Sequence, residues 1–285
     1  MKSLPLPEAP RRGEAVRMAC ASLLACGVRM LPPDPFALAG DLRIFLLRMS
    51  VLEAADPETF CAVLPQAAGQ EAFTAFLRGG FPDYFIFYND AVRSPERIRF
   101  SIFHEFGHIQ MRHFEAGDLK DISTGQYQVL EEEANIFARN FLCPPPIVDL
   151  IRGDPRDPKW AALFCVSEAA WQVRLRTLDA DRKFIDRHTA DLVRLQFLDY
   201  MFGRRCRECG MVFTDQARLG RCPGCGSRFL LWNPGLETRE EALRRRHVTG
   251  AVAEDLKPRL AEEQDPDLTA YWKMLRNSAS PFKKM

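Results

Sequence analysis

The stretch RFSIFHEFGHIQMRHF, residues 99–114, has apolar residues along its whole length yet holds three histidines and a glutamate. It follows Ser-Pro-Glu at 94–96, the order in which an N-cap, a first helical residue and a first-turn acid occur. We therefore predict a helix that is buried by its apolar residues. Residues four apart in an α-helix project from the same face, so His104 and His108 lie side by side, as two imidazoles that bind one zinc ion must.

Glu105 stands between these histidines, where a carboxylate can serve as general base. A zinc ion lowers the pKa of a water molecule toward about 7, and Glu105 would take the proton and later pass it to the leaving amine. A catalytic zinc site also needs a third protein ligand and an open position. Gly107 keeps the helix surface thin beside the site and leaves room for a packed element or a substrate.

The third ligand is expected from YQVLEEEANIFARNFL at 127–142, which we predict to be the next helix. Glu131 continues an apolar stripe formed by Ala134, Ala138 and Phe141, whereas the other two glutamates of EEE turn away from it at about 100° per residue. Glu131 is therefore the predicted ligand. The residue one turn later, Asn135, is expected to hydrogen-bond a ligand and fix its orientation.

Three further features near this site have both a functional and a structural reading. His113 is interpreted as a helix-end residue near the helix dipole rather than a ligand. Tyr127 is the nearest candidate donor to a tetrahedral oxyanion, although a rim tyrosine can equally serve packing. DYFIFYND at 83–90 is predicted to be a strand. We expect it in the core, with pairing to an extended substrate as the alternative.

HEFGH at 104–108 followed by EEEANIFARNFLCP at 131–144 resembles the ImmA/IrrE family of zinc metallopeptidases. That family has an HExGH helix and then a helix reading E-x-E-A-N/D-x-F-A-x-x-L-L-x-P. The likeness runs from about Phe36 to Leu178, with Cys143 where methionine is commoner. In the family the first glutamate of the second motif is the third ligand, which corresponds to Glu131.

The resemblance implies a zincin-like fold, a catalytic zinc ion and a location in the cytoplasm. It also implies a protein substrate, because family members cleave, or trigger cleavage of, helix-turn-helix repressors and so switch on mobile-element or stress genes. A zinc-dependent endopeptidase acting on such a repressor is the function that the resemblance favours. A small-molecule esterase or amidase is another possibility, since a zinc site can hydrolyse an ester or amide bond as well as a peptide bond.

A second metal site is predicted from CRECG and CPGCG, two CxxC pairs that are separated by twelve residues. Each CxxCG forms a tight knuckle whose glycine, Gly210 or Gly226, takes a left-handed conformation. Four thiolates complete a tetrahedral shell with no open position, so this zinc ion is structural, as in a zinc ribbon. The predicted ligands are Cys206, Cys209, Cys222 and Cys225.

The ribbon is rich in arginine, whereas the whole chain is not basic. The 39 basic and 38 acidic residues give no global field for nucleic acid or a membrane surface, so such binding needs a local patch. A nucleic-acid-binding regulator, with the peptidase-like domain as scaffold, is therefore the alternative function. A solvated face is the simpler reading of the ribbon arginines, which are Arg204, Arg205, Arg207, Arg218, Arg221 and Arg228.

The predicted fold class is α+β, mainly helical with a small β-sheet. We divide the chain into an N-terminal extension and helix at 1–34, a metallopeptidase domain at 35–200, a zinc ribbon at 201–233 and a polar helical tail at 234–285. The N-terminus does not read as a signal peptide, and no apolar run spans a membrane, so we expect a cytoplasmic protein without membrane contact. Five single cysteines are expected to be small buried residues.

Other helices are predicted from the N-cap residues and prolines that mark helix ends. The Asp34-Pro35 pair opens a helix that runs through 47, Ser167 caps one over 165–179, and the prolines at 144–146 end the second motif helix. Further helices are predicted at about 14–28, 57–63 and 70–77.

Overall fold

The computed structural model describes residues 6–42, 44–55, 57–58, 60–61, 70–76, 84–115, 122–151 and 153–232. These residues fall into two units. The described parts of the first lie within residues 1–19 and 34–141, and those of the second within 20–33 and 142–253. The polar tail predicted at 234–285 lies outside the described residues.

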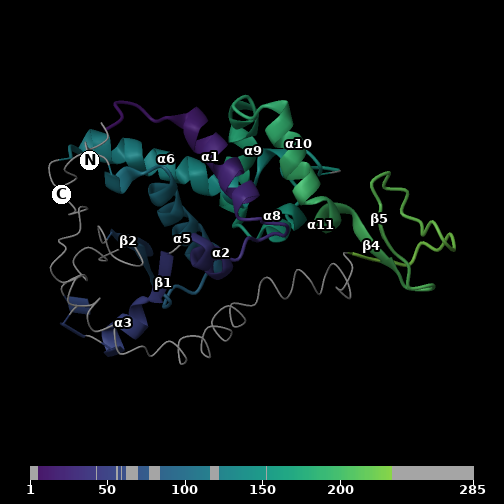
Figure 1. Ribbon diagram of the computed structural model, residues 1–285, viewed down its shortest axis with the longest axis horizontal. Coiled ribbons are helices and arrows are strands. Elements are labelled where there is room, and N and C mark those ends of the chain that lie inside the picture. The colour runs from purple at the N-terminus through teal and green to yellow at the C-terminus, as the bar shows by residue number, and fades with distance from the viewer. Residues whose placement is uncertain are drawn as a thin grey trace. The chain divides into compact units, whose positions relative to one another are not determined.

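Helix α5 (Pro95–Gln110) is the element of the first unit on which the site is built. Ser94 caps it as predicted, because its side chain accepts a hydrogen bond from the backbone N–H of Arg97 at 3.3 Å. The helix buries Ile102, Phe103 and Phe106 and continues into a short 3-10 turn at His113–Glu115. Figure 1 shows α5 between helix α6 (Thr124–Leu142) and the strands.

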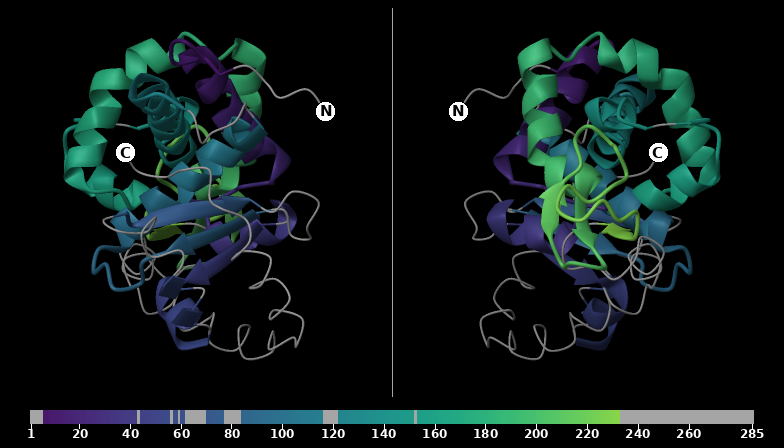
Figure 2. Two further views of the ribbon diagram at one scale, coloured as in Figure 1. Left: turned by 90° about the vertical axis from the view of Figure 1, so that its left-hand side faces the viewer. Right: turned by 90° about the vertical axis from the view of Figure 1, so that its right-hand side faces the viewer.

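The strands form a sheet with the order β1-β3-β2. β1 (Ile44–Arg48) runs parallel to β3 (Tyr84–Tyr88), and β2 (Ala72–Phe76) runs antiparallel to it. β3 is the predicted strand, and its central position confirms the core reading rather than the edge reading. Among the described strands, β2 is an edge strand. The left view of Figure 2 shows these strands side by side in blue.

One face of this sheet packs on an apolar cluster and the other meets α5. Phe73 and Phe87 stack with ring centroids 4.9 Å apart inside the cluster. Because side chains alternate along a strand, Thr74 takes the opposite face and contacts α5. The sheet thus brings a polar side chain to the helix that carries the histidines.

Two predictions of helix in this region are wrong, one over its C-terminal part and one over residues 72–76. The helix that begins at Pro35 ends at Leu42 as α2 (Pro35–Leu42), and Ile44–Arg48 pairs with β3 instead of continuing it. Residues 72–76, placed in a helix from sequence, pair with β3 along their whole length. In both cases pairing with an apolar central strand overrides local propensity. The helix predicted at 57–63 lies partly outside the described residues.

Helix α5 lies close to the backbone of α6 at Gly107. A Cβ built on Gly107 would lie 3.0 Å from both the Cα and the carbonyl oxygen of Ala134. Phe103 of α5 also stacks on Phe141 of α6, with ring centroids 4.8 Å apart. The space that sequence analysis leaves beside Gly107 is therefore filled by the backbone of the partner helix.

The second unit is a group of helices followed by the four-cysteine module. It contains α9 (Glu168–Arg182), capped by Ser167 as predicted, and α10 (Arg187–Gln196). Trp171 is buried against Phe164 and donates a hydrogen bond to the carbonyl of Pro155. The other helices are α7 (Pro145–Val148), α8 (Lys159–Phe164) and α11 (Leu198–Phe202). Helix α1 (Arg12–Ala25) crosses the boundary between the units.

The module begins where α11 ends, at β4 (Gly203–Cys206), as Figures 1 and 2 show. β4 pairs antiparallel with β5 (Val212–Thr214) on one side and with β6 (Leu230–Trp232) on the other. The described residues are mainly helical and carry two small sheets, which confirms the α+β class. Among them no helix is both long and apolar enough to cross a membrane.

Of the five single cysteines, three are buried as expected and two are not. Cys20, Cys143 and Cys165 lie in the interior, whereas Cys26 is half-buried and Cys61 is exposed. Burial raises the pKa of the Cys20 thiol to about 12, so it remains a neutral apolar side chain. The expectation of burial is thus wrong for Cys61, which lies in the segment 57–63 that is predicted to be a helix.

The close approach at Gly107 gives a first prediction. Gly107→Ala should lower the free energy of unfolding by about 1–3 kcal/mol, because the new methyl group must push α6 away from α5. Thermal or denaturant unfolding measures this directly. Gly125→Ala is the matched control, since a Cβ at Gly125 meets nothing within 4 Å. That control should be neutral or slightly stabilising, and an equally stable Gly107→Ala would contradict the packing described.

Candidate metal centre

The predicted ligands from the two helices meet at one point. Nε2 of His104 and Nε2 of His108 lie 3.1 Å apart, and each lies 3.3 Å from a carboxylate oxygen of Glu131. Ligand atoms arranged tetrahedrally around zinc at about 2.0 Å are separated by about 3.3 Å. The three atoms therefore form a triangle of the size that fits zinc, and these are the three residues expected from sequence.

The charges at this triangle favour a metal ligand set. Burial raises the pKa of Glu131, but hydrogen bonds with His104 and His108 outweigh burial and hold that pKa far below its ordinary value. Glu131 is therefore a carboxylate. Burial lowers the pKa of His108 to about 4, so its ring is neutral. A carboxylate and a neutral imidazole are the protonation states in which these side chains bind zinc.

Asn135 and Tyr127 lie on the same helix, one turn on either side of Glu131. Nδ1 of His104 lies 3.0 Å from the side-chain oxygen of Asn135, which accepts the hydrogen bond. With Nδ1 bound to Asn135, His104 presents Nε2 toward the metal position. Burial lowers the pKa of His104, but the hydrogen bond with Glu131 and the charge of Glu105 outweigh burial and raise that pKa, so a metal ion would displace a proton from Nε2. Tyr127 is half-buried, and burial followed by the charge of Glu131 and a hydrogen bond with it raises its pKa. Its role toward an oxyanion stays a prediction.

Glu105 faces the sheet side of α5. The hydroxyl of Thr74 donates a hydrogen bond to Oε2 of Glu105 at 2.6 Å, and both side chains are buried. Burial raises the pKa of Glu105, which the charge of His104 and the hydrogen bonds from Thr74 oppose. A raised pKa makes a carboxylate a better proton acceptor near neutral pH. Thr74 has no local signal in the sequence as a site residue, because it lies in the segment 70–77 that is predicted to be a helix.

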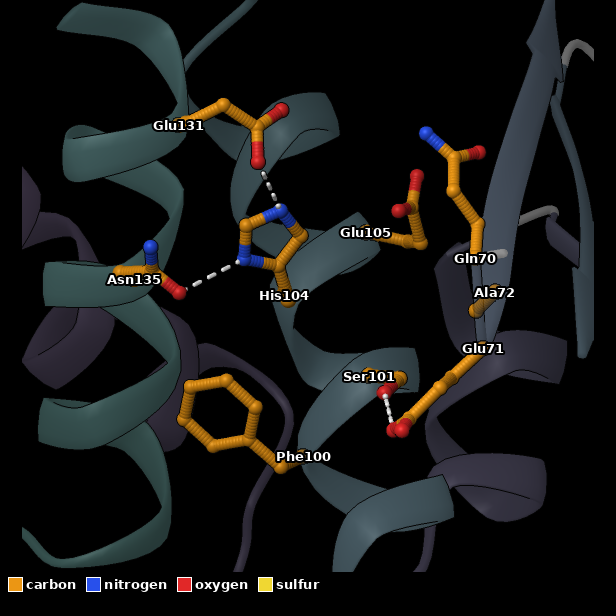
Figure 3. Close-up of a pocket in the computed structure, with 9 residues that line it drawn as sticks. All are labelled: Gln70, Glu71, Ala72, Phe100, Ser101, His104, Glu105, Glu131 and Asn135. Carbon is orange, nitrogen blue, oxygen red and sulfur yellow. Dashed lines mark hydrogen bonds and ion pairs between the residues drawn. The ribbon is translucent and has the colours of Figure 1, made fainter. Parts of the chain in front are cut away.

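A pocket of about 290 Å³ opens beside this centre. Figure 3 shows His104, Glu105 and Glu131 along it, with Asn135 on the α6 side. Its opposite wall is residues 70–72 at the start of β2. The pocket thus lies between the metal position and the edge strand, with the candidate base in its lining.

His113 is not the simple helix-end residue that sequence analysis describes. Its side chain is 1% exposed. Nδ1 of His113 lies 2.8 Å from Nδ1 of His108, and its Nε2 lies 2.9 Å from Oε2 of Glu133. Burial lowers the pKa of His113, although Glu133 opposes this effect. His113 therefore lies behind a metal ligand and outside the ligand triangle.

Glu133 is fully buried and ion-paired. Arg11 donates to it through Nε at 2.9 Å, through a terminal nitrogen at 2.7 Å and through its backbone N–H at 2.6 Å. Burial raises the pKa of Glu133, but the hydrogen bonds from His113 and Arg11 outweigh burial and lower it to about 2. The face argument that removed Glu133 as a ligand is consistent with this position. No local signal ties it to a residue 122 positions away.

The four cysteines of the second unit form a separate cluster, as predicted. Sγ of Cys206 lies 3.6 Å from that of Cys225, and Sγ of Cys209 lies 3.5 Å from that of Cys222. Sulfurs that surround zinc at about 2.3 Å are separated by about 3.8 Å, so the cluster has a suitable size for zinc. Backbone hydrogen bonds, that of Cys209 first, lower the pKa of Cys206 to about 6. This favours a thiolate at Cys206. At Cys209 and Cys225 backbone hydrogen bonds lower the pKa, but hydrogen bonds with the neighbouring cysteines outweigh them and raise it, so only a metal ion would bring all four to thiolates.

The two glycines of the knuckles take the expected conformation. Gly210 has φ 73° and Gly226 has φ 72°. The N–H of Gly210 donates to the carbonyl of Cys206 at 3.0 Å, and that of Gly226 to the carbonyl of Cys222 at 2.8 Å. Each knuckle thus turns tightly around its two sulfurs, and a side chain at either glycine would strain it.

The arginines of the module differ in what they do. Arg218 donates to the carbonyl of Leu150 at 2.8 Å and lies over the ring of Phe202, 4.6 Å from its centroid. Arg204 donates to the carbonyl of Gly203. Arg218 therefore ties the module to the rest of the second unit, whereas three other arginines are exposed on its surface, namely Arg207, Arg221 and Arg228.

Comparison with known proteins adds one finding to this geometry. Residues 63–176 match the model of the IrrE N-terminal-like domain, which is a family of M78 peptidases. The matched segment contains α5 and α6 and ends within α9. No curated protein matches the chain. The matched segment, residues 63–176, holds both motifs and the ligand triangle, and it is this segment that resembles the IrrE N-terminal-like domain.

Proposed function

We propose that this protein is a zinc-dependent endopeptidase that hydrolyses a peptide bond in a protein substrate. His104, His108 and Glu131 hold the catalytic zinc ion, and Glu105 is the general base. The observation that carries the proposal is the juxtaposition of a zinc-sized ligand triangle and a buried carboxylate along one pocket. The match to a metallopeptidase family supports it.

Each residue around the pocket has its own role in the proposed hydrolysis. A bound zinc ion supplies a Lewis acid for the scissile carbonyl and lowers the pKa of water. Glu105 takes the proton from the attacking water and delivers it to the leaving amine. Thr74 holds that carboxylate in place. Tyr127, beside Glu131, is our candidate to donate a hydrogen bond to the oxyanion.

The edge strand suits an extended substrate. β2 is paired with β3 on one side, and residues 70–72 at its start line the pocket. A peptide that adds to the outer edge of β2 uses backbone hydrogen bonds and passes Glu105. A protein segment is therefore a better fit than a small ester, which has no backbone to pair. We propose that the segment belongs to a helix-turn-helix repressor and that cleavage induces transcription of stress or mobile-element genes.

The first test of this proposal is metal content. The purified protein should hold about two zinc ions per chain, one in each cluster. Replacing His104 and His108 with alanine should leave about one, because the four-cysteine cluster does not depend on α5. Elemental analysis after dialysis gives the counts. A wild-type chain with one zinc ion, or an unchanged zinc count in the double variant, would contradict the assignment of a zinc ion to His104, His108 and Glu131.

The second test is cleavage of a helix-turn-helix repressor, and any repressor gene found beside the gene of this chain supplies the first candidate substrate. Glu105→Gln should keep both zinc ions but slow cleavage by at least about 100-fold, because the amide cannot accept the proton. Glu132→Gln is the control, since Glu132 is half exposed and pairs only at the surface with Arg12. It should cleave at the wild-type rate. Equal rates for Glu105→Gln and wild type would rule out Glu105 as the base.

A second candidate function rests on the exposed arginines of the four-cysteine module. Arg207, Arg221 and Arg228 could contact phosphates, in which case the protein is a nucleic-acid-binding regulator. The same variants separate the two candidates. DNA affinity that falls with salt and survives the loss of His104 and His108 supports the regulator. Loss of repressor cleavage in Glu105→Gln supports the peptidase.

A further inference from the structure

Each of the two candidate zinc-binding histidines contacts a partner through Nδ1, the ring nitrogen that is not directed at the metal position, and the two partners differ. A histidine that binds zinc through Nε2 must carry its proton on Nδ1. For His104 the partner of Nδ1 is the amide oxygen of Asn135, which can only accept. For His108 the partner is Nδ1 of His113, at 2.8 Å. A ring nitrogen can donate or accept, so this contact alone does not fix which of the two carries the proton.

Glu133 settles the direction of that hydrogen bond. A carboxylate only accepts, so His113 donates to Glu133 from Nε2 at 2.9 Å. A neutral His113 then has a lone pair on Nδ1 and accepts from Nδ1 of His108. The result is a chain of hydrogen bonds from His108 through His113 to Glu133. Each donor in it faces an acceptor, and Nε2 of His108 is left unprotonated toward the metal position.

Arg11 holds Glu133 in the position that this hydrogen-bond chain requires. The Glu133 side chain has 0% exposure and lies 2.7 Å from the guanidinium of Arg11. Arg11 meets both of its oxygens, and the backbone N–H of Arg11 adds a third hydrogen bond just before α1 begins. Glu133 thereby also caps the N-terminus of α1. The Glu133 carboxylate thus accepts a hydrogen bond at the start of α1 and also orients the zinc ligand His108 through His113.

We infer that Arg11, Glu133 and His113 are positioning residues for His108, which fix its ring tautomer and thereby set the affinity of the catalytic site for zinc. The inference rests on the proposed zinc site but not on any particular substrate. It also gives the start of α1 a role in the metal centre, because Arg11 directly precedes that helix and contacts Glu133. A purely structural cluster would stabilise the fold and leave zinc affinity unchanged.

The test compares neighbouring arginines that have different partners. Arg11 pairs with the buried Glu133, whereas Arg12 pairs at the surface with Glu132. Zinc is added through a chelator buffer, and the free zinc concentration that half-fills the weaker site is measured for each full-length variant. Arg11→Ala should need about 10-fold more free zinc to half-fill this site, because losing the groups that orient a metal ligand lowers metal affinity by about this factor. Arg12→Ala should match the wild type.

Variants of His113 test the same link from the other side. His113→Phe keeps a ring of similar size but cannot accept from His108, and it should weaken zinc binding by about 10–100-fold. His113→Gln should restore most of the affinity, because its oxygen can accept from His108 while its amide donates to Glu133. Circular dichroism and the zinc ion of the four-cysteine cluster report on whether each variant is folded.

The outcomes separate the inference from the function on which it rests. Wild-type zinc affinity in a folded Arg11→Ala variant would overturn the inference and leave the peptidase proposal intact. If His113→Phe does not fold, the comparison of Arg11→Ala with Arg12→Ala still decides. A wild-type protein that binds only one zinc ion would overturn both. Weakened binding in Arg11→Ala and His113→Phe, with recovery in His113→Gln, supports the positioning role.

Discussion

The contact between the backbones of α5 and α6 at Gly107 is the constraint on which the metal centre depends. A missing side chain lets α5 lie directly against Ala134, so Glu131 comes within 3.3 Å of both histidine Nε2 atoms. Asn135 reaches His104 from the same helix. Rigid helices packed at this distance hold the ligands without help from a loop, which is how a site keeps its geometry before the metal binds.

A buried helix with this many polar groups is tolerable only because each group has a partner. Burying a polar side chain without a hydrogen bond costs more than the bond returns. Here the sheet supplies Thr74 to Glu105, and α6 supplies Glu133 to the histidine behind His108. Arg11 then neutralises Glu133. The partners come from three separate elements, so the order of the site follows from the fold of the whole first unit.

The distance along the chain between a site residue and its partner also explains what the sequence could and could not predict. Helical periodicity and capping are local, and they placed His104, His108 and Glu131 on facing helices. The CxxCG knuckles are local as well, and their glycines adopt the expected left-handed backbone. Thr74, Glu133 and Arg11 act through contacts between distant parts of the chain, which have no local period. The two missed strands have the same cause, since pairing with β3 decides their conformation.

The central claim is that His104, His108 and Glu131 bind one zinc ion with the ring tautomers described. Anomalous diffraction at the zinc edge from a crystal of the zinc-loaded protein tests it most directly. We predict a peak about 2.0 Å from Nε2 of each histidine and beside the Glu131 carboxylate, with a second peak among the four cysteine sulfurs. A map without a peak between α5 and α6, or with the metal bound through Nδ1 of His108, would contradict the account.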